Sequence, residues 1–381
     1  MSIGFCALRR NLAAVSAAVA GKPDRQLFLS ILILLAIGIM MVLSASVLTA
    51  EARFSRPYLF LVKELVWVAL GLMALVGCSR LDYHRIQPAA RWAAVGALGL
   101  LILVLIPGLG VEVGHARRWL GLGPLRFQPS ELAKLALILY AADAIDRRRS
   151  RMGGLEGIAR PLLLLTVCAG LILLEPDFGT TMLVGVVIAT MLFLGGARIL
   201  HLGGMLLAVL PFILFGVLHS PYRLKRVLSF LHPESDPGGA GYQVLQSLVT
   251  LGSGGLTGLG PGQGRMKALF LPEPHTDFIF SVLGEEWGLI GTLTVVAIYA
   301  VVGWRGLRTA RRAPDLFGAL LAAGLTLTVV IQALLNMGVT TALLPAKGIP
   351  LPLISFGGSS LVVTCAGLGL LLSISRQSVR A

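Results

Sequence analysis

Charged residues are scarce in this sequence, making up 13% of its 381 residues, while 56% are hydrophobic and the mean hydropathy is +0.86. A soluble single domain of this length does not need so much apolar surface. Runs such as LFLSILILLAIGIMMVLSASVL (27–48) are long enough to cross about 30 Å of hydrocarbon. They also lack the period-two alternation of a membrane β-strand, which excludes a β-barrel. The sequence therefore predicts an all-α polytopic membrane protein.

Cysteine is also rare, and its four positions (Cys6, Cys78, Cys168 and Cys365) show no metal-ligand spacing. Three of them lie in or at the ends of apolar runs, where cysteine is typical of a small core residue.

Acidic residues are fewer than basic ones, 18 against 32, so the formal net charge is +14. The basic residues are scattered between hydrophobic runs, as topology signals are, and we expect no nucleic-acid partner.

Ten apolar segments are predicted to cross the membrane: 27–48, 59–78, 89–107, 131–146, 158–174, 180–196, 199–219, 278–303, 316–336 and 350–375. An even number places both chain ends on one side. The short arginine-rich segments, such as 147–151 and 305–312, mark that side as cytoplasmic. We therefore expect cytoplasmic tails at 1–26 and 376–381 and a single membrane domain over 27–375.

The opposite face is predicted to carry one long loop, over about 220–277. It contains SGGLTGLGPGQG (253–264), which lacks the Gly-Lys-Ser/Thr ending of a nucleotide-binding P-loop and lies outside the cytoplasm. A flexible or tightly turned loop is the better interpretation. No internal repeat is strong enough to indicate an inverted-repeat transporter.

The first polar cluster on that face is HARRWLGLGPLRFQPSELAKLALILY (115–140). Ser130 is predicted to cap a helix in which Glu131 and Lys134 share a face. A helix N-terminus beside guanidinium groups suits a phosphate or diphosphate. Alternatively, the arginines bind ordinary lipid head groups and Glu131–Lys134 is a structural pair. The arginines are Arg117, Arg118 and Arg126.

Two further clusters are shorter. In LLEPDFGTT (173–181), Asp177 lies in a short outer turn, where a carboxylate can hold an arginine, bind a metal or cap the next helix. We favour capping or pairing. In PYRLKRVLSF (221–230), Arg223 and Arg226 follow a predicted span. A basic cluster at a membrane surface is most often only the solvated end of a helix.

Carboxylates also enter an apolar helix in LPEPHTDFIFSVLGEEWG (271–288). Because a charge at the centre of a membrane helix costs roughly 2.5–3.5 kcal/mol, deep carboxylates must face the bundle interior, a cation or a wet cavity. Asp277 is expected at the rim, and Glu285 about 12 Å deeper. In LLPAKGIPLPLISFGGSS (343–360), prolines prevent regular helix before Ser355, and Lys347 is the only cation.

In their order and spacing, these motifs resemble the SEDS (shape, elongation, division, sporulation) family over about residues 25–375. Ala346-Lys347-Gly348 resembles the cell-division members more than the rod-elongation members. The sequence departs from the family pattern at three positions where it carries another apolar residue: Phe178, Trp287 and Phe356.

The resemblance implies ten membrane helices, with a large extracytoplasmic loop after the seventh. Members polymerise lipid II into glycan strands together with a class B penicillin-binding (FtsI-like) transpeptidase and other division proteins. The resemblance further implies a bacterial inner-membrane protein at the division septum that handles undecaprenyl-diphosphate-linked glycan and has no organic cofactor. The family's essential aspartate falls at Asp277.

Glycan polymerisation joins a sugar hydroxyl to the anomeric carbon of a diphosphate-linked donor with inversion. It needs one base and cationic help for the leaving diphosphate, and not the paired carboxylates of a retaining glycosidase. On the resemblance we assign Asp277 as the base and expect Glu131 and Asp177 to orient the cations. A divalent ion such as Mg²⁺ or Mn²⁺ could bridge the diphosphate, but no ligand set is readable. The candidate substrate contacts are Arg117, Arg118, Arg126, Lys134, Arg223, Arg226, His275, Lys347 and Ser355.

Two other functions use the same residues. A flippase that moves lipid II outward would need polar groups through the whole membrane, whereas the key groups here gather at one face. A scaffold that only activates a transpeptidase would not need Asp277. Glu285 and Glu286 are interpreted as structural.

Overall fold

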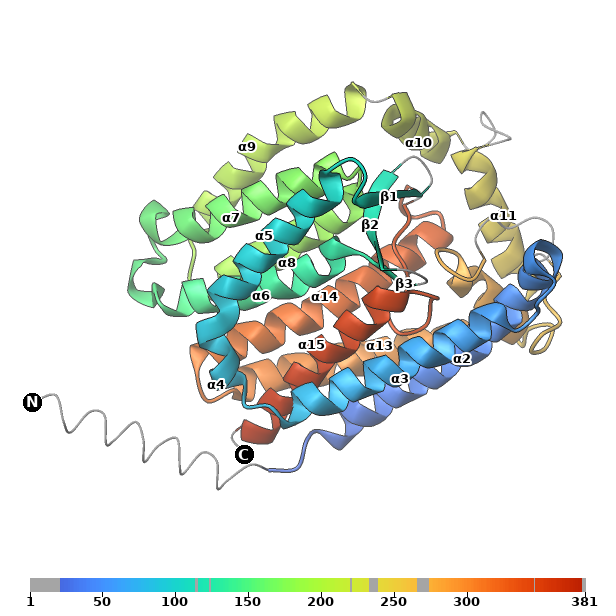
Figure 1. Ribbon diagram of the computed structural model, residues 1–381, viewed down its shortest axis with the longest axis horizontal. Coiled ribbons are helices and arrows are strands. Elements are labelled where there is room, and N and C mark those ends of the chain that lie inside the picture. Colours follow the sequence, from blue (N-terminus) through green and yellow to red (C-terminus); the bar gives the residue numbers. More distant parts are fainter. Residues whose placement is uncertain are drawn as a thin grey trace, which may run out of the picture.

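In the computed structural model, residues 21–113, 116–122, 125–219, 221–232, 239–265, 274–345 and 347–378 are described. Most of this chain is helical, and the long helices form one bundle (Figure 1), which confirms the predicted helical membrane fold. The first half holds α2 (Arg25–Phe54), α3 (Leu59–Arg80), α4 (Tyr83–Ile86), η1 (Gln87–Ala89), α5 (Ala90–Leu105), α6 (Pro129–Asp146), η2 (Arg149–Arg151), α7 (Leu155–Leu174) and α8 (Phe178–Leu194). The second half holds α9 (Ile199–Leu218), α10 (Pro221–Leu231), α11 (Ala240–Ser253), α13 (Ile279–Arg312), α14 (Leu316–Thr340) and α15 (Gly358–Gln377).

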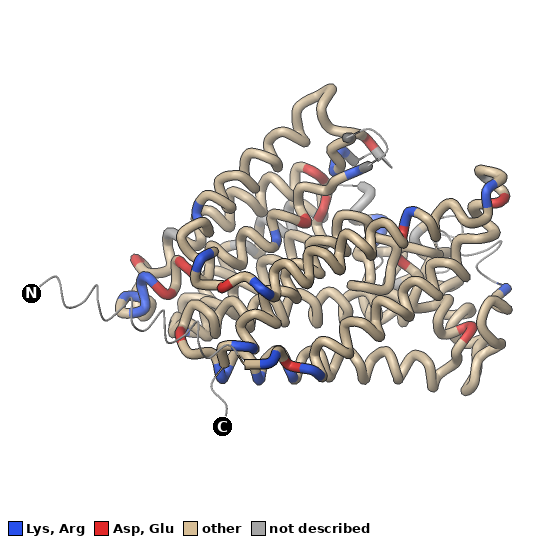
Figure 2. Tube along the Cα trace, turned by 60° about the horizontal axis from the view of Figure 1, so that its bottom comes forward, with Lys and Arg blue, Asp and Glu red and all other residues tan. Residues whose placement is uncertain are grey.

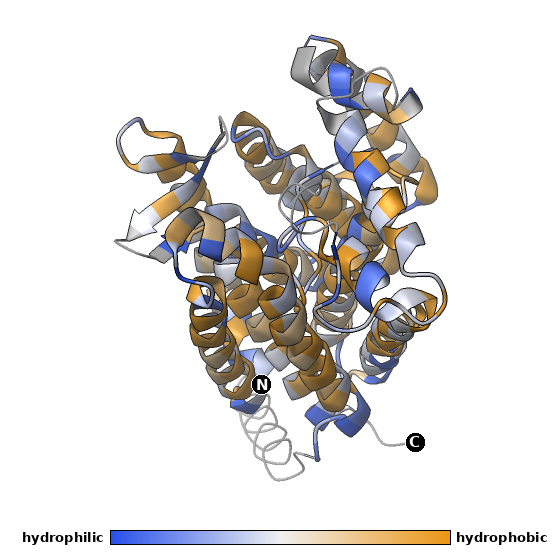
Figure 3. Ribbon diagram, turned by 90° about the vertical axis from the view of Figure 1, so that its right-hand side faces the viewer, coloured by the Kyte–Doolittle hydropathy of each residue, from blue (hydrophilic) through white to orange (hydrophobic). Residues whose placement is uncertain are grey.

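A helix covers most of each of the ten predicted spans. Seven of the apolar segments in the described chain are long enough to cross a membrane, and two helices, Phe178–Leu194 and Ile199–Ala208, are apolar but shorter. The exact number of crossings stays a prediction. The last span differs from its predicted bounds, because Pro350 and Pro352 keep the chain irregular and α15 begins only at Gly358. Figure 3 shows hydrophobic residues along the helices and hydrophilic ones mainly where they are connected.

Helices α3 and α15 make extensive contact, and small residues allow their close approach. A Cβ atom at Gly369 would lie 2.5 Å from the carbonyl oxygen of Leu75, and one at Gly71 would lie 2.8 Å from a methyl carbon of Leu361. Small residues at such contacts let membrane helices pack by van der Waals interaction, since no hydrophobic force acts between helices in lipid.

The two ends of the described chain are held together at one end of the bundle (Figure 1). The amide of Gly21 donates to the carbonyl of Arg376 over 2.8 Å, and the guanidinium Nε of Arg305 donates to Asp24 over 2.8 Å. We call these contacts the terminal clasp. Figure 2 shows that many of the charged residues lie near the ends of helices. Residues 1–20 and 379–381 of the predicted tails lie outside the described residues.

The opposite end of the bundle carries a small antiparallel sheet that the sequence analysis did not predict. Its strands are β1 (Gly110–Val113), β2 (Ala116–Leu122) and β3 (Leu125–Phe127), in the order β1-β2-β3. Leu120 of β2 pairs with Gly110 on one side and with Phe127 on the other. Three of the arginines in the first polar cluster are therefore presented by strands and not by an irregular loop.

The long loop predicted over about 220–277 is more structured than expected. It contains the two helices α10 and α11, followed by tight turns up to residue 265. Residues 254–265, which we call the glycine loop, have positive φ angles at Gly255, Gly258, Gly260 and Gly262. Only glycine adopts such angles readily, so the prediction of a tightly turned segment is confirmed.

Candidate functional site

The candidate site is centred on Asp277, which immediately precedes α13 at the bundle end that carries the sheet. The side chain of Asn336, on α14, donates to the carbonyls of both Asp277 and Ile349 over 2.8 Å. The Asp277 side chain is half-buried and faces Gly348, where a Cβ atom would lie 3.1 Å from the carboxylate oxygen Oδ2. The segment 347–349 therefore packs directly against the predicted base.

His275 and Ser355 lie beside Asp277 and fix its backbone. The buried His275 ring lies 4.7 Å from the Phe60 ring of α3, and the His275 carbonyl accepts a bond from the amide of Phe356 over 2.9 Å. The buried Ser355 hydroxyl donates to the carbonyl of Thr276 over 2.6 Å. Both residues thus tie the segment before α13 to the loop before α15. Their direct contact with substrate stays a prediction.

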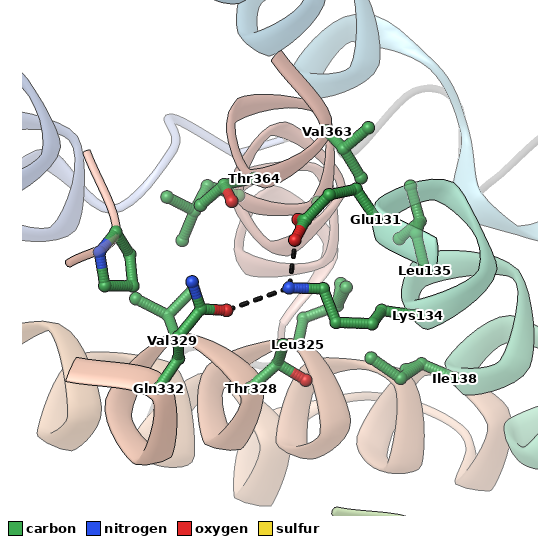
Figure 4. A pocket seen from close by; sticks show the side chains of 13 residues that line it. Glu131, Lys134, Leu135, Ile138, Leu325, Thr328, Val329, Gln332, Val363 and Thr364 are labelled. Carbon is green, nitrogen blue, oxygen red and sulfur yellow. Dashed lines mark hydrogen bonds and ion pairs between the residues drawn. The ribbon is translucent and has the colours of Figure 1, made fainter. Parts of the chain in front are cut away.

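A buried ion pair lies between α6, α14 and α15, next to the loop that precedes α15 (Figure 4). Lys134 Nζ is 2.9 Å from Glu131 Oε2 and 2.9 Å from the amide oxygen of Gln332. Ser360, on α15, donates to Glu131 over 2.8 Å, and Gln332 donates to the carbonyl of Pro350 over 2.9 Å. The pair lines a cavity of about 30 Å³, which is enough for water. The structural pair anticipated from the sequence is therefore present; its role in binding substrate stays a prediction.

The capping residue of α6 differs from the prediction. The N-cap is Gln128 and not Ser130, because Pro129 already occupies the first helical position. The Gln128 side-chain amide donates to the hydroxyl of Ser130 over 3.0 Å, and the backbone amide of Gln128 donates to the hydroxyl of Ser359 over 3.2 Å. Gln128 therefore connects the start of α6 with the start of α15.

Asp177 caps α8, as predicted. Its carboxylate accepts bonds from the amide of Thr180 over 3.1 Å and from the Thr180 hydroxyl over 2.8 Å. The Gln128 side chain approaches the same carboxylate at 3.4 Å. These contacts occupy Asp177 with helix and loop, and the orientation of a cation by Asp177 stays a prediction.

Glu175 lies two residues earlier and is fully buried. Burial, and then the neighbouring charge of Asp177, raise the pKa of Glu175 to about 8, against the opposing effect of Arg118. Its carboxylate oxygens have no hydrogen-bond partner among the residues that the structure describes.

Lys347 extends from the loop before α15 toward α8. Its ammonium group lies 5.1 Å from the centre of the Phe178 ring and 3.3 Å from the sulfur of Met182. Burial lowers the pKa of Lys347 from its ordinary value. Next to it, a Cβ atom at Gly179 would lie 2.7 Å from Ile349. The motifs around residues 177, 277 and 347 are therefore brought together by one loop.

The arginines are placed differently from one another. Arg118, on β2, donates to the carbonyls of Glu175 (2.9 Å) and Pro176 (2.6 Å), so it anchors the sheet on the turn between α7 and α8. Arg117 and Arg126 are exposed on the sheet, and Arg117 Nε lies 3.4 Å from Glu112. Arg223 and Arg226 belong to α10, which packs against α9 and α11. The Arg223 side chain lies outside the described residues.

Two site residues were missed in the sequence analysis. Gln332 and Asn336 lie one turn apart on α14, and their side chains face the irregular loop of residues 347–357. The available signal was the pair of amides spaced four residues apart within a long apolar run. Because uncompensated polar groups are costly inside a membrane, such a pair indicates a polar partner across the helix interface.

A divalent ion stays a prediction. The described residues contain no group of three or more His, Cys, Asp or Glu side chains suited to a metal. Asp277 offers one half-buried carboxylate, and one carboxylate together with phosphate oxygens of a substrate is a donor set typical of Mg²⁺. One such carboxylate fits an ion that is bound together with a diphosphate.

Comparison with known proteins gives one consistent result. The family described as "Cell cycle protein", which groups FtsW, RodA and SpoVE, matches residues 25–380. The chain is 41% identical over 357 residues to a probable peptidoglycan glycosyltransferase FtsW of Geobacter metallireducens, covering 93% of this chain and 95% of that protein. It is also 41% identical over 359 residues to stage V sporulation protein E of Bacillus subtilis, covering 94% of this chain and 98% of that protein.

Solved structures agree. A chain from a peptidoglycan synthase complex that coordinates polymerization and crosslinking matches with a TM-score of 0.77 and 34% identity, covering 93% of this chain and 98% of that one. The rod shape determining protein RodA of Thermus thermophilus matches with a TM-score of 0.69 and 31% identity, covering 94% of this chain and 98% of that one.

Proposed function

The chain belongs to the FtsW, RodA and SpoVE family of cell cycle proteins, and from this premise we propose that it is a peptidoglycan glycosyltransferase. It polymerises lipid II into glycan strands on the extracytoplasmic face of the inner membrane. One observation carries the proposal. The half-buried carboxylate of Asp277 lies just before α13 and faces a loop that also carries Lys347, and Asn336 binds the backbone carbonyl of Asp277.

Asp277 acts as the general base. Its carboxylate takes the proton from the 4-hydroxyl of the acceptor sugar while that oxygen attacks the anomeric carbon of the donor. The bond from this carbon to the diphosphate breaks in the same step, and the configuration inverts. The bonds from Asn336 and Ser355 keep the backbone around Asp277 in one position, which favours a single reactive geometry.

The departing diphosphate carries the charge that develops in the reaction. Lys347 is the cation of the same loop, and Arg117, Arg118 and Arg126 lie on the sheet at this end of the bundle. One guanidinium group can donate two parallel hydrogen bonds to the oxygens of a phosphate, so the arginines suit the diphosphate of a membrane-anchored substrate. A Mg²⁺ or Mn²⁺ ion bound with the diphosphate would neutralise further charge. A chelator should then lower glycan synthesis by the purified protein.

The test of this function is the substitution Asp277→Asn. The amide keeps the shape of the side chain but accepts no proton, so polymerisation of lipid II should fall by about 10²- to 10⁴-fold. Glu51→Gln, which removes an exposed carboxylate on α2, is the matched control and should leave the rate unchanged. Both variants should melt at the temperature of the wild type. Near-normal glycan synthesis by Asp277→Asn would exclude the assignment.

A lipid II flippase is the second candidate function. The polar residues of the described site belong to the starts of α8, α13 and α15 and to the loop before α15, which favours the enzyme over a path through the membrane. Proteoliposomes with labelled lipid II only on the outer leaflet separate the two. Glycan formed without any crossing of the membrane supports the enzyme, and lipid II transport without glycan supports the flippase. A scaffold without its own activity predicts that Asp277→Asn is fully functional.

The role in cell division and the partner are part of the proposal. The curated relatives named FtsW support division over rod elongation, and Ala346-Lys347-Gly348 supports the same choice. The similar chain from a peptidoglycan synthase complex supports a class B penicillin-binding transpeptidase as partner. The protein should therefore localise to the division septum, with both ends of its chain in the cytoplasm. A RodA-type role in elongation would instead give signal along the side walls.

A further inference from the structure

The helix that follows Asp277 is interrupted. Within α13, Gly288 has φ 66° and ψ −164°, which is outside the helical region and accessible mainly to glycine. In an unbroken helix the amides of Leu289 and Ile290 would bond to carbonyls four residues earlier. Here they bond to carbonyls of the glycine loop, namely those of Gly255 (3.0 Å) and Leu256 (3.2 Å). Residues 279–287 therefore form a half-helix separated from the long membrane helix that follows.

The carbonyls on the other side of the break are used by the same loop. Those of Glu285 and Glu286 accept bonds from the amides of Leu259 and Gly260, both over 3.0 Å. The glycine loop is thus inserted into the hydrogen-bond ladder of α13 and supplies partners to both sides of the break. The backbone amides and carbonyls at the break therefore have hydrogen-bond partners without a continuous helix, as buried backbone groups require.

The side chains at the break bind the loop as well. The carboxylate of Glu286 accepts from the amide of Gly262 over 3.0 Å and from the hydroxyl of Ser44 on α2. The carboxylate of Glu285 accepts from the amide of Arg265 over 2.7 Å. Each glutamate is 1% exposed, so these bonds lie away from water, where a hydrogen bond is stronger than in solvent.

Two glycines of the loop lie so close to the glutamates that a side chain would not fit. A Cβ atom at Gly258 would lie 2.1 Å from the carbonyl oxygen of Glu286, and one at Gly264 would lie 2.7 Å from the Glu285 carboxylate. These two glycines therefore allow the loop to approach α13 closely. The loop amides that would suit an external anion already bind these two carboxylates, which separates this loop from a phosphate-binding loop.

We propose that Glu285 and Glu286 are positioning residues that hold the Asp277 half-helix in place through the glycine loop. This inference rests on the proposed function, because it assigns Asp277 as the base. The half-helix is coupled to the rest of α13 only across a break, so its position depends on the inserted loop. At the other end, Asn336 and Ser355 fix the residues just before it. The half-helix of residues 279–287 is thus held at its far end by the glycine loop, and the preceding Asp277 is held through its backbone.

The test uses the full-length protein with Glu286→Ala, Glu286→Gln and the milder Ser44→Ala, and Glu51→Gln as the exposed control. Glycan polymerisation from lipid II and limited trypsin cleavage after the exposed Arg265 are measured on the same preparations, the cleavage by mass spectrometry. Glu286→Ala should lower kcat per folded enzyme by about 10- to 100-fold, with KM nearly unchanged, because the base is displaced and binding is not. Cleavage after Arg265 should become faster.

The remaining variants should lower kcat and raise the cleavage rate by smaller amounts. Glu286→Gln keeps one acceptor oxygen and should fall between the wild type and Glu286→Ala. Ser44→Ala removes a single bond and should give the smallest change in the same direction. The proposal is overturned if Glu286→Ala keeps the kcat of the wild type, or if its kcat falls while cleavage after Arg265 does not change. If the wild type itself makes no glycan, the proposed function fails, and the trypsin result alone decides whether the glutamates hold the loop.

Discussion

The buried carboxyl group of Glu175 makes the turn between α7 and α8 sensitive to pH. Its pKa is raised from 4.5 to about 8, first by burial and then by Asp177. The folded state therefore binds a proton that the unfolded chain releases at lower pH. Stability from this group is complete below pH 4.5 and is lost as the pH rises through about 8.

Glu175→Gln should flatten this dependence, because an amide does not ionise. The melting temperature of the detergent-solubilised wild type should fall between pH 4.5 and about 8 more steeply than that of Glu175→Gln. Thermal unfolding across this range measures the difference, with Glu51→Gln as a control that should follow the wild type. Parallel curves for wild type and Glu175→Gln would show that Glu175 is already ionised in the folded protein.

At the scale of single residues, the sequence identified the polar side chains of the site more reliably than it identified their hydrogen-bond partners. Asp177 is a helix cap and Glu131–Lys134 is an ion pair, as expected, because both depend on neighbours within four residues. Ser130 was assigned as a cap although Gln128 has that position. The partners Gln332 and Ser360 are far along the chain, so no local pattern identifies them.

At the scale of elements, α14 is the helix that aligns the site. Two of its amide side chains bind the irregular loop before α15, and one of them also binds the backbone of Asp277. Each bond satisfies a backbone carbonyl that lies outside the regular helices. The loop is therefore fixed by a neighbouring helix as well as by its own hydrogen bonds, such as those from the amides of Ile354 and Ser355 to the carbonyl of Leu351.

Asn336→Ala should remove two of these bonds at once. We expect a loss of about 1–3 kcal/mol in stability, since buried carbonyls are left without their donor, and a lower rate of glycan synthesis. Leu334→Ala, on the exposed side of the same helix, is the matched control and should leave the rate unchanged. Thermal unfolding and the lipid II assay measure both effects. Equal rates for the two variants would argue against a positioning role for α14.

The elements that were predicted poorly are those that depend on distant pairing. Helices over the apolar runs were anticipated because twenty or so apolar residues suffice to specify them. The three short strands and the break at Gly288 were not. One glycine in GEEWGL is a weak signal, and the loop that compensates the break comes from residues about thirty positions earlier.

At the scale of the whole molecule, the terminal clasp joins the first and last described segments. The backbone of Gly21 pairs with Arg376, which also donates to the carbonyl of Ser79 at the end of α3, and Arg305 holds Asp24. Contacts between segments 355 residues apart in sequence place both ends of the described chain on the same side of the bundle. The predicted orientation of the protein in the membrane then depends only on which side is cytoplasmic.

Cysteine labelling tests this orientation. In a variant without the four native cysteines, Glu51→Cys lies near the end of α2 that is predicted to be extracytoplasmic, and Arg311→Cys lies near the predicted cytoplasmic end of α13. A membrane-impermeant maleimide applied to spheroplasts should label the first position, and the second only after the membrane is opened. The reverse pattern would invert the predicted topology.

The interruption at Gly288 affects how α13 can adapt to bilayers of different thickness. A continuous helix must tilt as one rod when the hydrocarbon region becomes thinner or thicker. Here the helix direction can change at Gly288, while the glycine loop joins the two stretches through the amides of Leu289 and Ile290 and the carbonyls of Glu285 and Glu286. We therefore expect a change in bilayer thickness to be taken up partly by bending at Gly288, and less by a tilt of the segment that leads to Asp277.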